Sequence, residues 1–383
     1  MDPLFRLASE MVAIPSVNPM GRALSGPEFL ETRMTNYLEN WFKERGIPCT
    51  RQLVSPGRDN LFAKYESPTS RDTILFDVHQ DTVPTDGMTI PPFTPVIDNG
   101  RLYGRGSCDV KGSMASMLSA FERLHRERPR GSASVLLVFT VDEEFTHTGS
   151  SSLAEFEHGA KLAVVAEPTR LNLVHCHKGA IRWKIWTRGV ACHSSKPDQG
   201  INAIYRMGEV LRHLAEYAQG LSVAQPDPIL GPPTLSVGRI EGGVSVNVVP
   251  DWCVVEVDRR LIPGESPMES RQKVRTFLDS RLGNPDWLEF GDPWVCMPAL
   301  RSDGGLDWTE PIRDAIASAT GRRPELIGVP FGTDAGPLGA AGLPSVVFGP
   351  GDIAQAHTKD EWIELEQLTL AAEAYYKIAL ATG

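Results

Sequence analysis

The chain has 383 residues, of which 41% are hydrophobic and 22% are charged, and its formal net charge is −10. This length accommodates two domains, or one large domain with an insertion. The negative charge argues against nucleic acid as a partner, because phosphate binding requires a basic surface. No apolar run approaches the roughly 18 residues of a membrane span, and the N-terminal residues include acids where a signal peptide needs an apolar core. The six cysteines contain no C-x-x-C pair, so we expect reduced thiols and a cytoplasmic location.

Alternating helical and apolar segments predict an α/β fold with a mainly parallel sheet flanked by helices. The first helix is predicted over residues 28–46, with Leu30 on its apolar face, and another helix follows Asp109. Four short segments are almost entirely apolar, as expected for strands that are covered on both faces. These strands are predicted at residues 73–79, 134–141, 162–167 and 345–349.

The middle of the chain has a different pattern. Residues 180–190 alternate between apolar and polar side chains, which is typical of a sheet with one exposed face. A helix, two strands, a helix and a short strand are predicted to follow, near residues 200–218, 234–241, 247–261, 267–282 and 287–291. This β-α-β-β-α-β order is the ferredoxin-like arrangement. We therefore predict that residues 179–293 form an inserted α+β domain, and that residues 1–178 and 294–383 form the larger domain.

Potential metal ligands recur at or after the ends of the predicted strands, and one more precedes a helix. In open α/β sheets the functional site lies outside the carboxyl ends of the strands, so these side chains are expected to converge. Taken singly, such a histidine is more often part of the core, and a pair of glutamates is more often a solvated strand end. The recurrence at successive strand ends favours a metal site instead. The candidate ligands are His79, Asp109, Glu144, Glu167 and His357.

The charge of this cluster favours two metal ions over one. Its three carboxylates would be destabilising if they were buried without cations. Two divalent cations leave one positive charge, which suits a hydroxide, whereas a single cation leaves the site negative. The nitrogen and oxygen ligands suit zinc best, and cobalt or manganese less strongly.

Residues close in sequence to the candidate ligands are predicted to support them. Asp81, two residues after His79, is placed to accept the other N–H of the imidazole. Glu143 stands beside a ligand and is placed to deprotonate a water. Asp142 is expected at the surface, and His147, in a polar loop, is given no role.

Five segments together resemble the M20 family of metallo-aminoacylases and peptidases. They are HQDTVP (79–84), GSCDVKG (106–112), DEE (142–144), AEPT (166–169) and AH (356–357). The resemblance extends from about residue 70 to residue 362. It implies a zinc-exopeptidase-like catalytic domain, and it makes the inserted domain a lid and dimerisation domain.

The resemblance also implies which ligands bind each of the two metal ions. Asp109 would bridge two metal ions, with His79 and Glu167 completing one site and Glu144 and His357 the other. Asp81 would orient the histidine ligand, and Glu143 would act as general base and later as acid. The Asp109–Val110 peptide would be cis, as it often is in this family.

Four further residues are implied in substrate binding. His193, in the lid, would reach the oxyanion, and Asn247 would bind the oxyanion or a substrate carboxylate. Arg259 would hold that carboxylate through its planar fork, although Arg260 is the adjacent alternative. Thr333 lies in a glycine-rich loop that would supply backbone donors, and an ordinary loop is the alternative there.

The function that this resemblance implies is a di-zinc hydrolase that cleaves the amide bond of an N-acyl amino acid. A metal-bridging hydroxide would attack the amide, as in acetylornithine deacetylase or succinyl-diaminopimelate desuccinylase, in amino-acid biosynthesis. The alternative is a metallo-carboxypeptidase or dipeptidase of the same family. A non-catalytic scaffold is disfavoured because all five ligands and Glu143 are present. An oxidoreductase is disfavoured because the chain lacks the G-x-G-x-x-G pattern after its first strand.

Overall fold

The computed structural model describes residues 1–223, 226–301, 303 and 306–383. The chain divides into two compact units. The first comprises Met1–Cys176, Leu300–Gly328 and Thr333–Gly383, and the second comprises His177–Ala299 and Val329–Gly332. The range predicted for the inserted domain, 179–293, falls within the second unit.

An eight-stranded sheet organises the first unit, and its four central strands β6, β3, β7 and β17 run parallel. Antiparallel strands flank them, so the prediction of a mainly parallel sheet is confirmed. Every residue of the four central strands is buried, because helices cover both faces. In sheet order the strands are β1 (Cys49–Ser55), β2 (Arg58–Tyr65), β6 (Ser134–Thr140), β3 (Thr73–His79), β7 (Leu162–Val165), β17 (Ser345–Val347), β8 (Leu173–His177) and β16 (Leu326–Val329).

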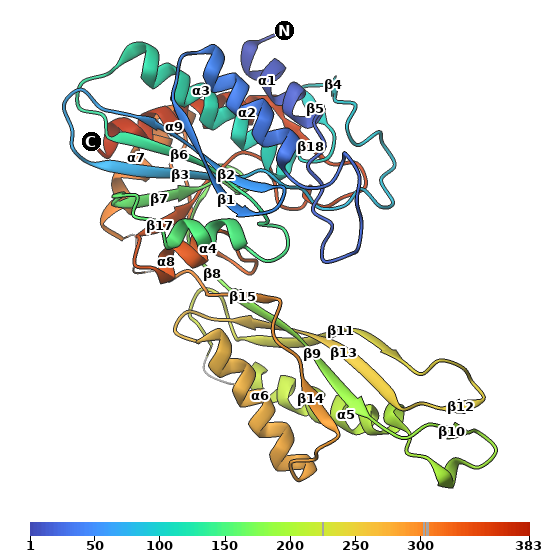
Figure 1. The fold of residues 1–383 in the computed structure, drawn as a ribbon. Helices are drawn as coiled ribbons and strands as arrows, with labels where there is room; N and C mark the ends of the chain where they lie inside the picture. Colours follow the sequence, from blue (N-terminus) through green and yellow to red (C-terminus); the bar gives the residue numbers. More distant parts are fainter. Residues whose placement is uncertain (224–225, 302, 304–305) are drawn as a thin grey trace. The chain divides into compact units, whose positions relative to one another are not determined.

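Figure 1 shows α1, α2 and α3 on one side of this sheet and α4 and α8 on the other. Helix α2 begins at Thr32, later than predicted, because Leu30 has the left-handed φ of 63° that a helix excludes. A small sheet of β4 (Val96–Asp98), β5 (Arg101–Tyr103) and β18 (Trp362–Glu364) completes the unit. The described helices of this unit are α1 (Pro3–Val12), α2 (Thr32–Glu44), α3 (Gly112–Glu127), α4 (Thr148–Ala154), α7 (Leu306–Thr320), α8 (Ala335–Ala340) and α9 (Leu365–Ala381).

The turn that precedes α3 carries Asp109. It is the short segment Ser107–Lys111, and it contains a cis peptide bond between Asp109 and Val110, as the family resemblance implied. A side chain at Gly112 would place its Cβ 2.5 Å from the Ser107 carbonyl oxygen. Only glycine therefore allows the helix to start this close to the turn.

The second unit contains an antiparallel sheet in the order β11 (Thr234–Gly242), β13 (Trp252–Leu261), β9 (Gly179–Arg188) and β14 (Leu288–Phe290). The helices α5 (Ala203–Ser222) and α6 (Pro267–Leu282) complete the predicted ferredoxin-like arrangement. Strand β15 (Val295–Met297) also pairs with β9. The strand predicted over 247–261 is interrupted at Pro250, which separates the short β12 (Val248–Val249) from β13. Strand β12 pairs with β10 (Cys192–His193).

The two faces of this second sheet differ. Ile181 and Trp183 are fully buried in a core that also contains side chains of α5 and α6. On the other face, Arg182 forms an ion pair with Asp258 at 2.6 Å. Each side chain of that pair is between a quarter and a third exposed. Across the described ranges of both units, no helix is long and apolar enough to cross a membrane.

Candidate metal centre

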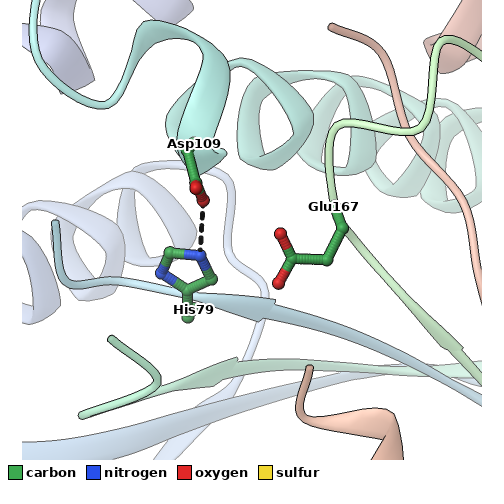
Figure 2. Close-up of side chains that lie close together, drawn as sticks. All are labelled: His79, Asp109 and Glu167. Atoms are coloured by element: carbon green, nitrogen blue, oxygen red, sulfur yellow. Dashed lines mark hydrogen bonds and ion pairs between the residues drawn. The ribbon is translucent and has the colours of Figure 1, made fainter. Parts of the chain in front are cut away.

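One group of potential ligands forms at the carboxyl ends of β3 and β7. His79 is the last residue of β3, Glu167 follows β7, and Asp109 comes from the turn before α3. Figure 2 shows these three side chains directed toward one another, with the Nε2 atom of His79 3.0 Å from Oδ1 of Asp109. Their ligand atoms all lie within 4.8 Å of one another, and all three residues are buried.

A second group of ligands meets the other oxygen of Asp109. The Nε2 atom of His357 lies 3.3 Å from Asp109 Oδ2 and 3.0 Å from Glu144 Oε2. Asp109 thus offers one carboxylate oxygen to each group. The structure therefore brings all five predicted ligands together, in the two sets that the resemblance implied.

The donor chemistry of these groups fits divalent cations. Each group combines one imidazole nitrogen with carboxylate oxygens, which is a ligand set that suits zinc and similar metals. The Nδ1 atom of His79 lies 3.0 Å from the main-chain oxygen of Asp81, and its N–H donates to that oxygen. In a neutral ring this bond keeps the proton on Nδ1, so Nε2 would offer its lone pair to a metal ion.

The pKa values in the cluster reflect its excess of negative charge. Burial, followed by the charge of Asp109, raises the pKa of both Glu144 and Glu167. Burial lowers the pKa of His357, but the charge of Glu144 and the hydrogen bonds to both carboxylates raise it to about 11. For Asp109, burial is outweighed by the hydrogen bonds from the two histidines, and its pKa is lowered. Bound cations would relieve the same excess of negative charge that these protons otherwise offset.

A buried carboxylate holds the turn that carries Asp109. Glu361 accepts hydrogen bonds from the main-chain N–H groups of Gly106, Cys108 and Asp109 at 2.9–3.1 Å. Arg105 neutralises it with an ion pair of 2.6 Å. Glu361 and Asp109 are far apart in sequence, so the C-terminal part of the chain fixes the turn that carries the carboxylate shared by the two groups.

Asp81 uses its main-chain oxygen and its carboxylate for different partners. Its carboxylate is 3.6 Å from Nδ1 of His79, so the main-chain oxygen is the nearer partner of the ring. The carboxylate oxygens accept the main-chain N–H groups of Glu143 and Glu144 at 3.1 and 3.2 Å. The amide of Asn18 donates to the same carboxylate at 2.8 Å. Asp81 therefore braces the segment that carries the predicted base.

Asp142 is buried, and its prediction as a surface residue is wrong. It is 5% exposed and lies 3.2 Å from the guanidinium of Arg58. It also accepts hydrogen bonds from Asn18 and from the hydroxyl of Thr148, at 2.8 and 2.7 Å. Arg58 pairs in addition with the fully buried Glu31 at 2.5 Å. The acid is buried because these partners, which come from elsewhere in the chain, satisfy it.

Sequence reasoning gave no role to two residues beside Glu143. The Nδ1 atom of His147 lies 3.1 Å from Asp334 Oδ1 and 3.6 Å from Glu143 Oε1. All three residues are buried. Burial, followed by the charge of Glu167, raises the pKa of Glu143 well above its ordinary value. No local pattern in the sequence distinguishes Asp334. It stands in the glycine-rich segment GTDAG, in which only Thr333 was predicted to have a role.

Two residues that the resemblance assigned to the oxyanion lie together in the second unit. His193 is in β10, and Asn247 immediately precedes β12, the strand that pairs with β10. The Asn247 carbonyl oxygen accepts the main-chain N–H of Ser194 at 3.1 Å. Both side chains are exposed, and Nδ1 of His193 is 2.7 Å from the hydroxyl oxygen of Ser195.

The two adjacent arginines of β13 differ in burial. Arg259 is 1% exposed and forms an ion pair with Glu265 at 2.6 Å. Arg260 is more exposed and lies 2.8 Å from Asp258. Thr333 is fully buried in the first unit, just before α8.

Comparison with known proteins supports the chemistry of this site. Residues 75–381 match the sequence model of the family described as Peptidase family M20/M25/M40. An acetylornithine deacetylase of Myxococcus xanthus is 35% identical over 346 residues, which make up 88% of each chain.

Solved structures support the fold. The M20 family metallo-carboxypeptidase Sso-CP2 of Sulfolobus solfataricus superposes with a TM-score of 0.81 at 17% identity, over 100% of this chain and 99% of that chain. YXEP of Bacillus subtilis, described as a dinuclear metal binding peptidase from the M20 family, gives a TM-score of 0.68 at 18% identity, over 98% and 96% of the two chains. The sequence match covers most of the chain, and the chain is therefore a metal-dependent hydrolase that belongs to peptidase family M20/M25/M40.

Proposed function

We propose that this protein is a di-metal hydrolase that removes the acyl group from the nitrogen of an N-acyl amino acid. The observation that carries the proposal is the position of Glu143. It is 8% exposed and electrostatically coupled to His79, Glu144 and Glu167, yet it belongs to neither group of ligands. A buried carboxylate that is free of the metals is suited to proton transfer.

In this proposal, five residues bind the metal ions and Glu143 transfers the proton. Two divalent cations, zinc in our proposal and cobalt or manganese as alternatives, would supply polarisation of the amide carbonyl and activation of water. His79 and Glu167 would hold one cation, Glu144 and His357 the other, and Asp109 both. Glu143 would accept the proton of the attacking water and return it to the leaving amine.

We infer an N-acyl amino acid as the substrate because similar proteins are named acetylornithine deacetylases. The acetylornithine deacetylase of Myxococcus xanthus shares 35% identity with this chain, and that of Pectobacterium carotovorum subsp. carotovorum shares 29% over 377 residues. Substrates of the acetylornithine or succinyl-diaminopimelate type are small products of amino-acid metabolism that carry a free carboxylate. A role in amino-acid biosynthesis and a cytoplasmic location follow as further parts of the proposal, which substrate profiling and cell fractionation would test.

A metallo-carboxypeptidase or dipeptidase is the second candidate. The observation that favours it is the fold similarity to the carboxypeptidase of Sulfolobus solfataricus, which extends over the whole chain. Both activities need the same attack on an amide carbonyl, so the metal ligands and Glu143 serve either one. Only the groups that contact the rest of the substrate distinguish the two.

Four residues are proposed to contact the substrate. His193 and Asn247 would stabilise the oxyanion, since they lie together and are accessible. Arg259 would bind a carboxylate, and among the described residues its buried Nε atom has no hydrogen-bond partner. Thr333 would position backbone donors at the start of α8. Arg259→Lys keeps the charge but loses the planar fork, so we expect a raised KM with kcat little changed.

We also propose that the second unit forms a homodimer. Three large apolar side chains surround a surface hollow of 820 Å³, and Tyr205, Val244 and Val246 are 77%, 78% and 99% exposed. Exposed apolar side chains gathered in one place are typical of an interface. Val246→Glu combined with Tyr205→Glu should convert a dimer to a monomer in analytical ultracentrifugation. Val223→Glu, at an equally exposed valine outside the hollow, is the matched control.

The deciding experiment measures amine release by metal-loaded protein from a panel of substrates. The panel contains N-acetylornithine, N-succinyl-diaminopimelate, other N-acyl amino acids and short peptides. We expect release from one acyl amino acid, and its loss in Glu143→Gln and after chelation. Glu155→Gln, a change at an exposed glutamate, is the matched control and should behave as wild type. Cleavage of peptides alone would favour the second candidate, and no cleavage by protein with two bound metals would overturn the proposed substrate class.

A further inference from the structure

His147 lies between two buried carboxylates that belong to neither ligand group of the metal centre. Its Nδ1 atom is 3.1 Å from Oδ1 of Asp334 and 3.6 Å from Oε1 of Glu143. The three residues are 9%, 1% and 8% exposed, in that order. The ring donates a hydrogen bond to Asp334 and lies within ion-pair distance of Glu143, so it offsets part of the repulsion between the two carboxylates.

The chain places this imidazole by a tight turn after β6. The main-chain N–H of His147 donates to the Asp142 carbonyl oxygen at 2.8 Å, and its φ is 56°. The side chains of Thr146 and Thr148 both donate to the Asp142 carboxylate, which closes the turn. His147 is thereby folded back toward Glu143, only four residues before it in sequence.

Asp334 is fixed from a separate direction. It stands at the start of α8, and its Oδ2 atom accepts the hydroxyl of Thr140, the last residue of β6, at 2.8 Å. Its other oxygen is therefore held toward His147. Because Asp334 is the nearer of the two acceptors, it orients the ring with its proton on Nδ1.

We propose that His147, oriented by Asp334, is a positioning residue that holds the Glu143 carboxylate for proton transfer. The inference rests on the proposed function, because it assigns His147 a role in the step that Glu143 performs. The restraint acts on the base alone: His147 is in neither group of ligands that contains Asp109. A base held in place needs less reorganisation when the proton moves, so its loss slows turnover more than it weakens binding.

The first test compares variants of His147. His147→Ala is expected to lower kcat by about 10–100-fold, with KM and metal content unchanged. His147→Asn places an amide N–H near the position of Nδ1–H and is expected to recover most of that loss. His125→Ala removes a half-buried histidine of the same unit, beside Tyr65 and Phe121, and should leave kcat unchanged.

A double-mutant cycle separates positioning from a structural role. If His147 acts through Glu143, His147→Ala has no further effect on residual turnover in the Glu143→Gln background. An equal loss in both backgrounds would overturn the proposal. So would the loss of a third equivalent of bound metal in His147→Ala, because it would make the three residues a cation site.

A measurement that needs no turnover tests the same contact. In protein labelled with ¹⁵N-histidine, the His147 ring should carry its proton on Nδ1, and that resonance should shift in both Glu143→Gln and Asp334→Asn. A ring that responds to Asp334→Asn but not to Glu143→Gln would overturn the proposal. If the wild type hydrolyses nothing in the panel, the proposed function fails, while the NMR result still decides the role of His147.

Discussion

Two sets of charged side chains, one in each compact unit of this M20 hydrolase, differ in their access to water. In the first unit, His79, Asp109 and Glu167 are buried beside the ends of parallel strands, and each depends on a specific partner. In the second unit, Arg182 and Asp258 pair on the partly exposed face of an antiparallel sheet, and His193 is exposed. Water can replace a lost partner of the Arg182–Asp258 pair, but it cannot replace a lost partner of the buried side chains at the strand ends. The comparison suggests that chemistry is concentrated where replacement by water is prevented.

The largest expected effect is that of Asp109→Ala. Both ligand groups share this carboxylate, so its loss should reduce metal affinity by more than the roughly 100-fold that removal of an outer-shell partner costs, and it should abolish turnover. Metal content after dialysis, together with calorimetric titration, measures the change. Asp98→Ala, at an exposed acid of the same unit, is the control. Two tightly bound metals in Asp109→Ala would contradict the assignment of Asp109 as the shared ligand.

The next largest effect is expected for Arg58→Met. This guanidinium lies between Glu31 and Asp142, so its removal leaves the buried Asp142 carboxylate without a cation, and Glu31 as well once it ionises above about pH 8. Breaking a buried ion pair in this way costs about 3–5 kcal/mol. Denaturant unfolding of the metal-free protein measures the free energy, and a loss below about 1 kcal/mol would show that water reaches the pair.

The burial of Glu31 should make the free energy of unfolding depend on pH. Burial, followed by the charge of Asp81, raises the pKa of Glu31 from 4.5 to about 8. Between these pH values the folded chain retains a proton that the unfolded chain releases, so this group lowers the free energy of unfolding as pH rises. Glu31→Gln has no such group, and its stability relative to wild type should increase by a few kcal/mol from pH 5 to pH 8. The opposite slope would mean that Arg58 keeps Glu31 ionised.

The smallest effect is expected in the second unit. Arg182→Met removes one partner of the pair with Asp258, whose side chains are each between a quarter and a third exposed. Such pairs contribute about 0–1 kcal/mol, so the free energy of unfolding should change by less than about 1 kcal/mol. The denaturant titration used for Arg58→Met measures this change as well, so the losses of unfolding free energy in the two variants can be compared. A cost equal to that of Arg58→Met would remove the distinction between the two units.

The sequence predicted those parts of the site that depend on strand ends. His79, Glu144 and Glu167 follow apolar runs whose burial is almost dictated by their composition, and parallel strands bring their ends to one edge. The ferredoxin-like order of the second unit was predictable for a related reason, because alternating and helical periodicities mark its elements. Among the elements that were predicted, the differences lie mainly in their ends, such as the late start of α2 and the break at Pro250.

The missed residues depend on contacts that no local pattern records. Asp142 looked like a solvated acid because its partners, Arg58 and Asn18, lie far away in sequence. His147 had no periodic neighbours, and its role appears only when the turn folds it toward Glu143 and α8 brings Asp334 beside it. Long-range polar pairing of this kind is set by tertiary structure, whereas apolar periodicity is visible in a single segment.

The hydrogen bonds of Glu361 have a consequence for the chain as it is synthesised. Glu361 holds the main-chain N–H groups around Asp109, and His357 comes from the same late segment. A nascent chain that ends before residue 357 already contains His79, Asp109, Glu144 and Glu167, but it lacks the fifth ligand and the carboxylate that shapes the Asp109 turn. All five ligands and the carboxylate that shapes the Asp109 turn are therefore present together only after residues 357 to 361 have been synthesised.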